Sequence, residues 1–420
     1  MRILFTILPV TSHLLPLAPV AWALQSAGHE VRVVTHTHPT MPGVISGAGL
    51  NAVSLGERID LAAAVRATFE NETLQGIAEA LAIDPEDSNL WQMVRHYVVS
   101  TFGMYFQPDG GHPMVDELIE FTESWQPDLV IWDPLFFPAP IAARACGAVH
   151  ARLLWGLDRF GWIRSEFRKW LAEDASRPDL MAAAMKPTLD RLGQEFDEEL
   201  LVGKWTIDPT PPEMRLPTDL TYVPVRPVPY NGAVEVPAWL LERPSKPRVC
   251  LTLGTSGREL FAENEISVDE VLRSMAELDI EVVATLNATQ LAAVETVPAT
   301  VRTIDYLPLN LLLPTCSAIV HLGGTGTLAA AVAQEVPQLL IPKDGSEYVD
   351  FANFVASRGA GVVIEQRNLT TDLVKEQLVR LLGEQSFKDG AATLRKEMMA
   401  TPSPTEIVPV LEKLTVQHGR

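Results

Sequence analysis

Residues 319–327, with the sequence IVHLGGTGT, constrain the fold of this chain more than any other segment. They predict an apolar strand, then a glycine-rich turn that carries His321, then a helix that begins at about Thr327. Such a turn directs backbone N–H groups and the positive end of a helix dipole at one point, where a phosphate can bind. The residues expected at that phosphate are His321, Gly323, Gly324, Thr325, Gly326 and Thr327. We therefore expect a nucleotide-linked substrate; the alternative is that His321 is a hydrogen-bonded core residue and the glycines only form a tight turn.

A second turn of the same kind follows the apolar stretch 248–253. It offers the backbone of Gly254, the hydroxyls of Thr255 and Ser256, and the guanidinium of Arg258. Two anion-binding turns in one half of the chain suit a diphosphate that is held from two sides. An ordinary loop between a strand and a helix is the alternative interpretation.

The first turn also fits a rival motif. Gly324, Gly326 and Ala329 match the dinucleotide fingerprint G-x-G-x-x-G/A, and Asp344 lies near the position of the acid that would bind the ribose. A nicotinamide-dependent dehydrogenase is therefore an alternative, although this motif leaves the Gly254 turn unexplained.

Length, charge and cysteine content exclude several classes of protein. A chain of 420 residues is expected to form two domains, and its net charge of −20 argues against nucleic acid and against an anionic membrane surface. Cys146, Cys250 and Cys316 lie far apart without a CxxC pair, so we expect no disulfide framework and no metal site. The apolar N-terminus is broken by prolines and lacks a signal-peptide cleavage site, and no segment could span a bilayer. We expect a soluble, cytoplasmic protein.

The predicted elements form two α/β halves. Strands are expected at residues 2–9, 30–35, 128–132 and 151–155, and then at 248–253, 281–285, 318–321 and 338–341, with a helix at 17–27 after the first strand. Prolines crowd residues 209–247, which is typical of a stiff linker. The expected division is a first domain at 1–225, a linker at 226–247, a second domain at 248–400, and a C-terminal helix at 401–420 that packs back on the first domain.

His13 is the candidate general base. It is expected at the carboxyl end of the first strand, where open α/β sheets bind ligands, and an imidazole can take a proton from an attacking hydroxyl near neutral pH. Asp133 follows another predicted strand and could orient His13, but the sequence leaves open whether the two touch. A capping or buried polar histidine is the alternative.

Aromatic residues gather near the predicted strand ends of the first half. We expect a group of them to bind a large apolar molecule, since such pockets are mostly apolar with few polar anchors. The residues in that group are Phe136, Phe137, Trp155 and Trp162. For each residue taken singly, plain core is an equal alternative.

Several further segments occur together in one known family. They are SH at 12–13, WQPDLVIWDP at 125–134, FDEE at 196–199, VGKWTID at 202–208, PYNG at 229–232, LTLG at 251–254 and PLNLLLPTC at 308–316. With these segments and the His321 turn, nearly the whole chain resembles the two-domain glycosyltransferases that attach deoxysugars to macrolide, anthracycline and related polyketide aglycones.

The resemblance implies the α/β fold called GT-B, in which two Rossmann-like domains face each other. The N-terminal domain would bind the apolar aglycone, and the C-terminal domain would bind a thymidine-diphosphate (TDP) deoxysugar. The reaction would invert the anomeric carbon without a metal ion or a cofactor. The resemblance adds Leu307 to the donor-binding residues, and it places Glu347 and Tyr348 near the sugar ring.

The chain departs from the family pattern at two places. Leu322 replaces the second of two histidines, and Glu347-Tyr348 stands where the family has an aspartate followed by a polar residue. A degenerate protein that binds a sugar nucleotide without turnover is therefore an alternative to an enzyme.

Part of the family works with an auxiliary protein that resembles a cytochrome P450. Residues 61–106 are the candidate docking segment for such a partner, through Trp91, Tyr97, Phe102 and Tyr105. A homodimer is also left open.

Overall fold

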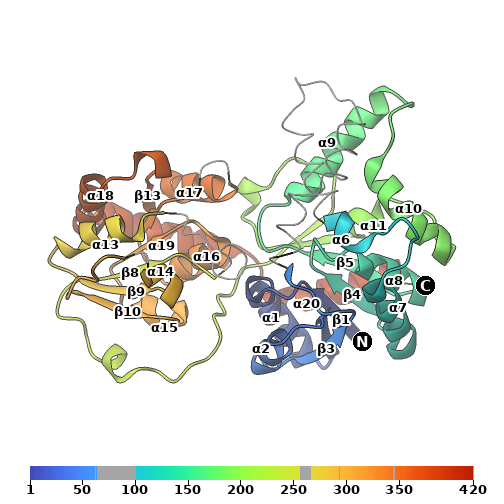
Figure 1. The fold of residues 1–420 in the computed structure, drawn as a ribbon, viewed down its shortest axis with the longest axis horizontal. Helices are drawn as coiled ribbons and strands as arrows, with labels where there is room; N and C mark the ends of the chain where they lie inside the picture. Colours follow the sequence, from blue (N-terminus) through green and yellow to red (C-terminus); the bar gives the residue numbers. More distant parts are fainter. Residues whose placement is uncertain (62, 64–100, 256–265, 293, 344–345, 420) are drawn as a thin grey trace. The chain divides into compact units, whose positions relative to one another are not determined.

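The computed structural model describes residues 1–420 except 62, 64–100, 256–265, 293, 344–345 and 420. The chain divides into two compact units, residues 1–225 with 405–420 and residues 226–404. Each unit is built on one sheet of parallel strands, which confirms the two predicted α/β halves (Figure 1). Among the described residues, no helix has the length and apolar character needed to cross a membrane.

The sheet of the first unit has seven strands in the order β3-β2-β1-β4-β5-β6-β7. The strands are β1 (Arg2–Ile7), β2 (Glu30–His36), β3 (Asn51–Leu55), β4 (Leu129–Trp132), β5 (Val149–Leu153), β6 (Thr206–Asp208) and β7 (Tyr222–Pro224). The order runs away from β1 in both directions, so β1 and β4 form the topological switch point. In open parallel sheets, ligands bind outside the carboxyl ends of the strands at this point.

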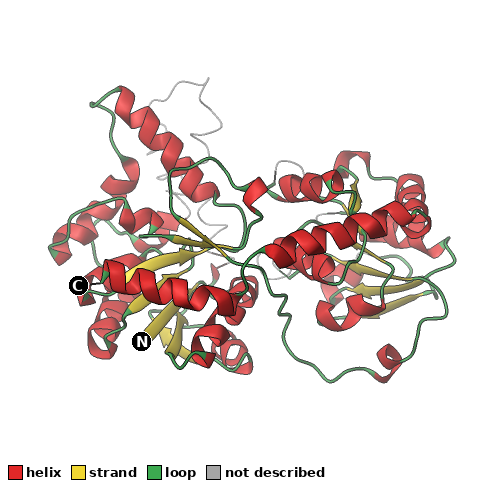
Figure 2. Cartoon of the chain, turned by 180° about the vertical axis from the view of Figure 1, so that it is seen from behind, coloured by secondary structure: helices red, strands yellow, loops and turns green. Residues whose placement is uncertain are grey.

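Along the chain, helices follow the strands of this unit, and several of them pack against its sheet (Figure 2). They are α1 (Thr11–Ser26), α2 (Met41–Gly47), α6 (Gly103–Tyr105), α7 (Pro113–Trp125), α8 (Pro138–Cys146), α9 (Arg159–Glu173), α10 (Leu180–Leu192), α11 (Glu199–Val202) and α20 (Pro404–His418). The C-terminal helix α20 belongs to this unit, where Glu412 lies 2.9 Å from Nε2 of His29 and the ring of His418 lies 5.7 Å from that of Trp205.

The sheet of the second unit has six strands in the order β10-β9-β8-β11-β12-β13. The strands are β8 (Arg248–Thr252), β9 (Glu281–Thr285), β10 (Val301–Ile304), β11 (Ala318–His321), β12 (Gln338–Leu340) and β13 (Gly361–Val363). The helices are α13 (Val268–Ala276), α14 (Ala288–Ala292), α15 (Leu309–Leu312), α16 (Thr325–Ala333), α17 (Tyr348–Ser357), α18 (Thr371–Gly383) and α19 (Gln385–Ala400). Val249 and Leu251 of β8 lie in one apolar cluster and Cys250 in another, so both faces of the sheet are covered. The switch point lies between β8 and β11.

Helix α1 differs from the prediction. It begins at Thr11 instead of residue 17 and runs through Pro16 and Pro19. Each proline removes one backbone hydrogen bond, yet the helix continues because Leu14, Leu17 and other residues are buried against the unit. His13 therefore lies in the first turn of a helix, fixed by its N–H bond to the carbonyl of Val10, instead of in a loop.

Candidate active site

His13 and Asp133 meet at the first switch point. His13 is in the helix that follows β1, and Asp133 is the residue after β4. Because β1 and β4 pair in parallel, with Thr6 opposite Trp132, the residues after both strands emerge side by side. Nδ1 of His13 lies 2.5 Å from Oδ2 of Asp133. The structure thus answers the question that the sequence left open: the two side chains touch.

The bonds of Asp133 determine the tautomer of His13. Its side chain is 1% exposed, and its other oxygen, Oδ1, accepts a hydrogen bond from the N–H of Leu135 at 2.9 Å. An ionised carboxylate only accepts hydrogen bonds, so the proton on His13 is at Nδ1. Nε2 of the neutral ring then carries a lone pair that can take a proton.

Trp155 forms a third part of this site. It follows β5, and its ring centroid lies 4.9 Å from that of His13, with 33° between the ring planes. Trp155 is half-buried, as is Trp162 on α9. Each therefore keeps part of its surface exposed.

Phe136 and Phe137, unlike Trp155 and Trp162, lie in the core of the unit. Both side chains are fully buried in an aromatic cluster, in which the ring of Phe137 lies 4.5 Å from that of Phe102 and 5.2 Å from that of Phe160. A bound molecule could touch them only if their neighbours moved. In this structure they are core residues.

The aromatic cluster contains two residues of the predicted docking segment 61–106, Phe102 and Tyr105. Most of that segment, including Trp91 and Tyr97, lies outside the described residues. Phe102 and Tyr105 are 1% and 0% exposed, so these two side chains pack inside the unit and present no surface to a partner.

One polar pair at this edge was missed from the sequence. His36 ends β2, is 2% exposed, and has its Nε2 3.1 Å from the hydroxyl of Tyr105. Burial, with a contribution from the charge of His112, lowers the pKa of His36 to about 4, so its ring is neutral. Burial and the charge of Asp133 raise the pKa of Tyr105. The available signal was the position of His36 at a strand end, like that of Asp133.

The turns expected to bind phosphate lie at the second switch point. Gly254 follows β8 with a φ of +76°, a conformation that favours glycine, and Thr255 beside it is half-buried. Ser256 and Arg258 lie outside the described residues. The His321 turn follows β11, the strand that pairs with β8. Sheet topology therefore brings the two turns to the same edge.

His321 is more enclosed than the sequence suggests. It is 1% exposed, its Nδ1 accepts from the N–H of Gly323 at 3.1 Å, and its Nε2 donates to Oε1 of Gln338 at 2.9 Å. Burial lowers the pKa of His321 to about 4, so the ring is neutral. Both ring nitrogens are engaged inside the unit, as in the core-histidine alternative. Gln338, which holds Nε2, was not singled out from the sequence.

The remaining donor-site candidates surround this turn. Gly324 is the N-cap residue of α16, and Thr325, Gly326 and Thr327 form the first turn of that helix. A Cβ on Gly323 would lie 3.2 Å from both Cβ and the carbonyl oxygen of Tyr348. The turn therefore packs against the start of α17, where Glu347 and Tyr348 are half-buried.

Two leucines near the turn are core residues. Leu322, at the position of the missing second histidine, is 7% exposed and packs in an apolar cluster with residues such as Val320. Leu307 is 3% exposed in the cluster on the other face of the sheet. A contact between Leu307 and a ligand would therefore involve its backbone.

The chain matches a known family over most of its length. Residues 22–254 match the N-terminal domain described as erythromycin biosynthesis protein CIII-like, and residues 269–414 match the corresponding C-terminal domain. The chain is 43% identical to an aclacinomycin-T 2-deoxy-L-fucose transferase of Streptomyces galilaeus, over 100% of this chain and 97% of that protein. It is 42% identical to a 10-deoxymethynolide desosaminyltransferase of Streptomyces venezuelae, over 100% and 98%.

A solved structure shows the same architecture. The glycosyltransferase VinC, in complex with dTDP, superposes with a TM-score of 0.82 at 36% identity, over 99% of this chain and 100% of that one. The chain therefore belongs to the erythromycin biosynthesis protein CIII-like family. It is a deoxysugar glycosyltransferase, and its fold is GT-B.

Proposed function

We propose that this enzyme transfers a deoxysugar from a TDP-sugar to a hydroxyl of an apolar polyketide-type aglycone, with inversion and without a metal ion or cofactor. The 2.5 Å contact between His13 and Asp133 at the first switch point carries the proposal. The relatives add support, since one is named for transfer of 2-deoxy-L-fucose and another for transfer of desosamine.

In the proposed reaction, His13 acts as the general base. Nε2 takes the proton of the acceptor hydroxyl while its oxygen forms a bond to the anomeric carbon. The bond from that carbon to the diphosphate oxygen breaks, and TDP leaves with the electron pair. Asp133 accepts from Nδ1–H and stabilises the imidazolium that forms. Trp155 and Trp162 contact the aglycone.

The donor is proposed to bind at the second switch point. The N–H groups at the start of α16 and the Gly254 turn hold the diphosphate, with Thr255, Ser256 and Arg258 as further ligands. Glu347 accepts hydrogen bonds from the sugar, and Tyr348 supports a ring with few hydroxyls. A bond from Nε2 of His321 to a phosphate oxygen would replace its bond to Gln338, while Nδ1 continues to orient the N–H of Gly323.

Removal of the His321 side chain tests the donor site. His321→Ala should weaken binding of thymidine diphosphate by about tenfold or more, because a hydrogen bond to a charged group contributes about 1.5–3 kcal/mol. Calorimetry with thymidine diphosphate measures this affinity. An unchanged affinity would remove His321 from the donor site.

Incubation with a panel of TDP-deoxysugars and polyketide aglycones tests the whole proposal. We expect a glycosylated product with inverted anomeric configuration and no loss of rate in EDTA. Donor binding without turnover would instead support the degenerate partner, and oxidation of a substrate with a nicotinamide cofactor would support the dehydrogenase. Full turnover by the purified chain would exclude a required P450-like partner, and light scattering would decide whether the chain forms a homodimer.

A further inference from the structure

Trp155 lies on a short loop that is fixed on both sides. The loop spans residues 154–158, between the end of β5 and the start of α9. The N–H of Leu154 donates to the carbonyl of Ile207 at 3.0 Å, and the carbonyl of Gly156 accepts from the hydroxyl of Thr210 at 3.0 Å. Trp155, the ring beside His13, is therefore held between two hydrogen-bonded neighbours.

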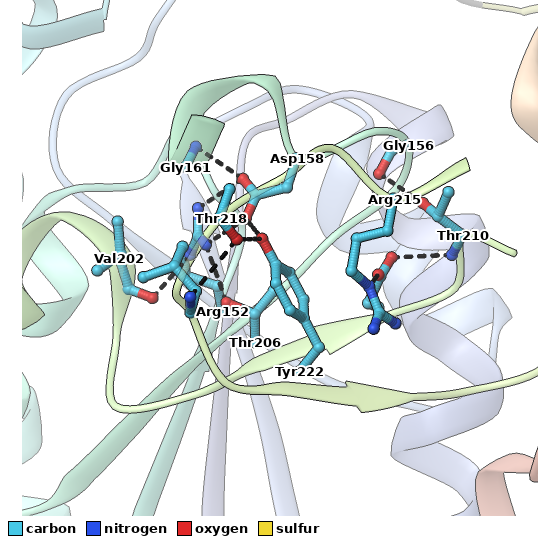
Figure 3. Close-up of polar contacts among 12 residues, drawn as sticks. Arg152, Gly156, Asp158, Gly161, Val202, Thr206, Thr210, Arg215, Thr218 and Tyr222 are labelled. Carbon is cyan, nitrogen blue, oxygen red and sulfur yellow. Dashed lines mark hydrogen bonds and ion pairs between the residues drawn. The ribbon is translucent and has the colours of Figure 1, made fainter. Parts of the chain in front are cut away.

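The far end of the loop is anchored by a buried ion pair. Nη1 of Arg152 lies 2.9 Å from Oδ1 of Asp158, and Nη2 lies 2.5 Å from Oδ2 (Figure 3). The hydroxyl of Tyr222 donates to the same Oδ2 at 2.9 Å, and the N–H of Gly161 donates to Oδ1 at 2.8 Å. The side chains of Arg152 and Asp158 are 0% and 3% exposed.

Burying Arg152 and Asp158 costs free energy, because both charges must leave water, so an ion pair is not the simplest way to stabilise a loop. Apolar residues of similar volume often stabilise a fold as well as a buried ion pair does, whereas the two-point contact of Arg152 with Asp158 also fixes the relative orientation of the two side chains. The two contacts that hold the loop, from Thr210 to Gly156 and from Tyr222 to Asp158, are also linked to each other. Thr210 donates its N–H to Asp208, whose carboxylate binds Arg215, and the guanidinium of Arg215 lies 4.5 Å from the ring centroid of Tyr222 (Figure 3).

We propose that Thr210 and Tyr222 are positioning residues for the transfer reaction. Through Gly156 and Asp158, they hold the loop in the position that keeps Trp155 packed against His13. The ring of Trp155 then limits the orientations of the imidazole and shields one side of it from water. This inference rests on the proposed role of His13 as general base.

Chemical modification of His13 tests the proposal without a substrate. Diethyl pyrocarbonate acylates neutral imidazole, and peptide mass spectrometry reads the rate at His13 separately from the other histidines. Thr210→Val keeps the side-chain shape but removes the hydroxyl that binds Gly156, and Tyr222→Phe removes the hydroxyl that binds Asp158. We expect each to raise the rate at His13 by about three- to tenfold, the factor that corresponds to loss of one hydrogen bond to the loop. Tyr222→Phe also removes a bond to Thr218, which lies outside the loop.

Two comparisons separate positioning from general stability. Thr122→Val is the matched control, because the buried hydroxyl of Thr122 also donates to backbone carbonyls, those of Ile119 and Ala142, but far from the Trp155 loop in sequence. It should lower the melting temperature without changing the rate at His13. In a Trp155→Ala background, Thr210→Val should have no further effect on that rate.

Two results would overturn the positioning role. One is an unchanged rate at His13 in both Thr210→Val and Tyr222→Phe. The other is an effect of Thr210→Val that persists when Trp155 is absent. Failure of the proposed function is read separately, from transfer by His13→Ala: normal turnover there would remove the general base, whatever the modification rates show.

Discussion

The bond between His13 and Asp133 joins side chains that are 120 residues apart in the sequence. Its geometry determines which nitrogen carries the proton, so loss of the carboxylate should affect chemistry more than binding. Asp133→Asn places an amide next to Nδ1, and its N–H₂ group can favour the tautomer that leaves Nε2 protonated and unable to accept. We expect kcat to fall by about tenfold or more, since a charge-assisted hydrogen bond contributes about 1.5–3 kcal/mol.

Steady-state kinetics with a donor and aglycone pair measures this change. Asp128→Asn is the matched control, because Asp128 lies exposed before β4, at the opposite end of the strand, where it binds the N–H of Arg2. It should leave kcat near the wild-type value. Equal losses in the two variants would mean that Asp133 has only a structural role.

At the scale of elements, the start of α9 depends on one close approach. Asp158 is its N-cap residue, and a Cβ on Gly161 would lie 2.4 Å from Oδ2 of Asp158. That carboxylate is held by Arg152 and cannot move aside cheaply. Gly161→Ala should therefore lower the free energy of unfolding by about 1–3 kcal/mol, the usual cost of overpacking, and raise the KM for the aglycone.

Urea unfolding with Gly43→Ala as control checks this prediction. Gly43 is also helical, in α2, and a Cβ there would meet nothing within 4 Å. Its replacement should be neutral or stabilising, because alanine favours a helix more than glycine does. If both variants had the same stability, the close approach at Gly161 would not matter.

The sequence predicted the strands of the fold better than the start of helix α1. Strands such as β4 and β11 are short runs of buried apolar residues, so their pattern and the glycine turns indicated both sheets. The start of α1 was missed, because Pro16 and Pro19 signal a helix break locally while the buried face keeps the helix intact. The Arg152–Asp158 network could not be predicted, since Thr206 and Tyr222 come from two other strands that only the sheet brings beside residues 152–158.

For the candidate site, the sequence predicted which residues lie at the sheet edge but not which of them are exposed. Strand ends at a switch point gave His13, Asp133 and the glycine turns, because topology alone places them at one edge. Exposure could not be derived, since an aromatic residue near a strand end suits both a pocket and a core. Trp155 is half-buried, whereas Phe136 has no exposed surface.

At the scale of the whole molecule, buried histidines predict loss of stability in mild acid. Burial, with the nearby charges of Lys204 and Arg144, lowers the pKa of His150 from 6.5 to about 3, and burial lowers that of His321 to about 4. The unfolded chain therefore takes up protons below pH 6.5 that the folded chain does not. The stability is fully present above pH 6.5 and is lost as the pH falls toward the folded-state values.

His150→Leu isolates this effect. Between pH 7.5 and 5, the wild type should lose about 2 kcal/mol more stability than the variant, because each pH unit well below the unfolded-state pKa of 6.5 corresponds to about 1.4 kcal/mol. The comparison is needed because the net charge of −20 also shrinks in acid, which reduces self-repulsion in both proteins. Parallel stability curves from pH 7.5 to 5 would contradict the prediction.

The central claim is that His13 removes the acceptor proton in a transfer from a TDP-deoxysugar. The most direct test is the turnover of His13→Ala with a donor and aglycone pair that the wild type accepts, together with its affinity for thymidine diphosphate. We predict that kcat falls by about two to four orders of magnitude, the usual contribution of a positioned base, while the affinity stays unchanged because the residues of the proposed donor site belong to the other unit. Near-normal turnover by His13→Ala would contradict the claim and would favour direct deprotonation by a carboxylate such as Asp133.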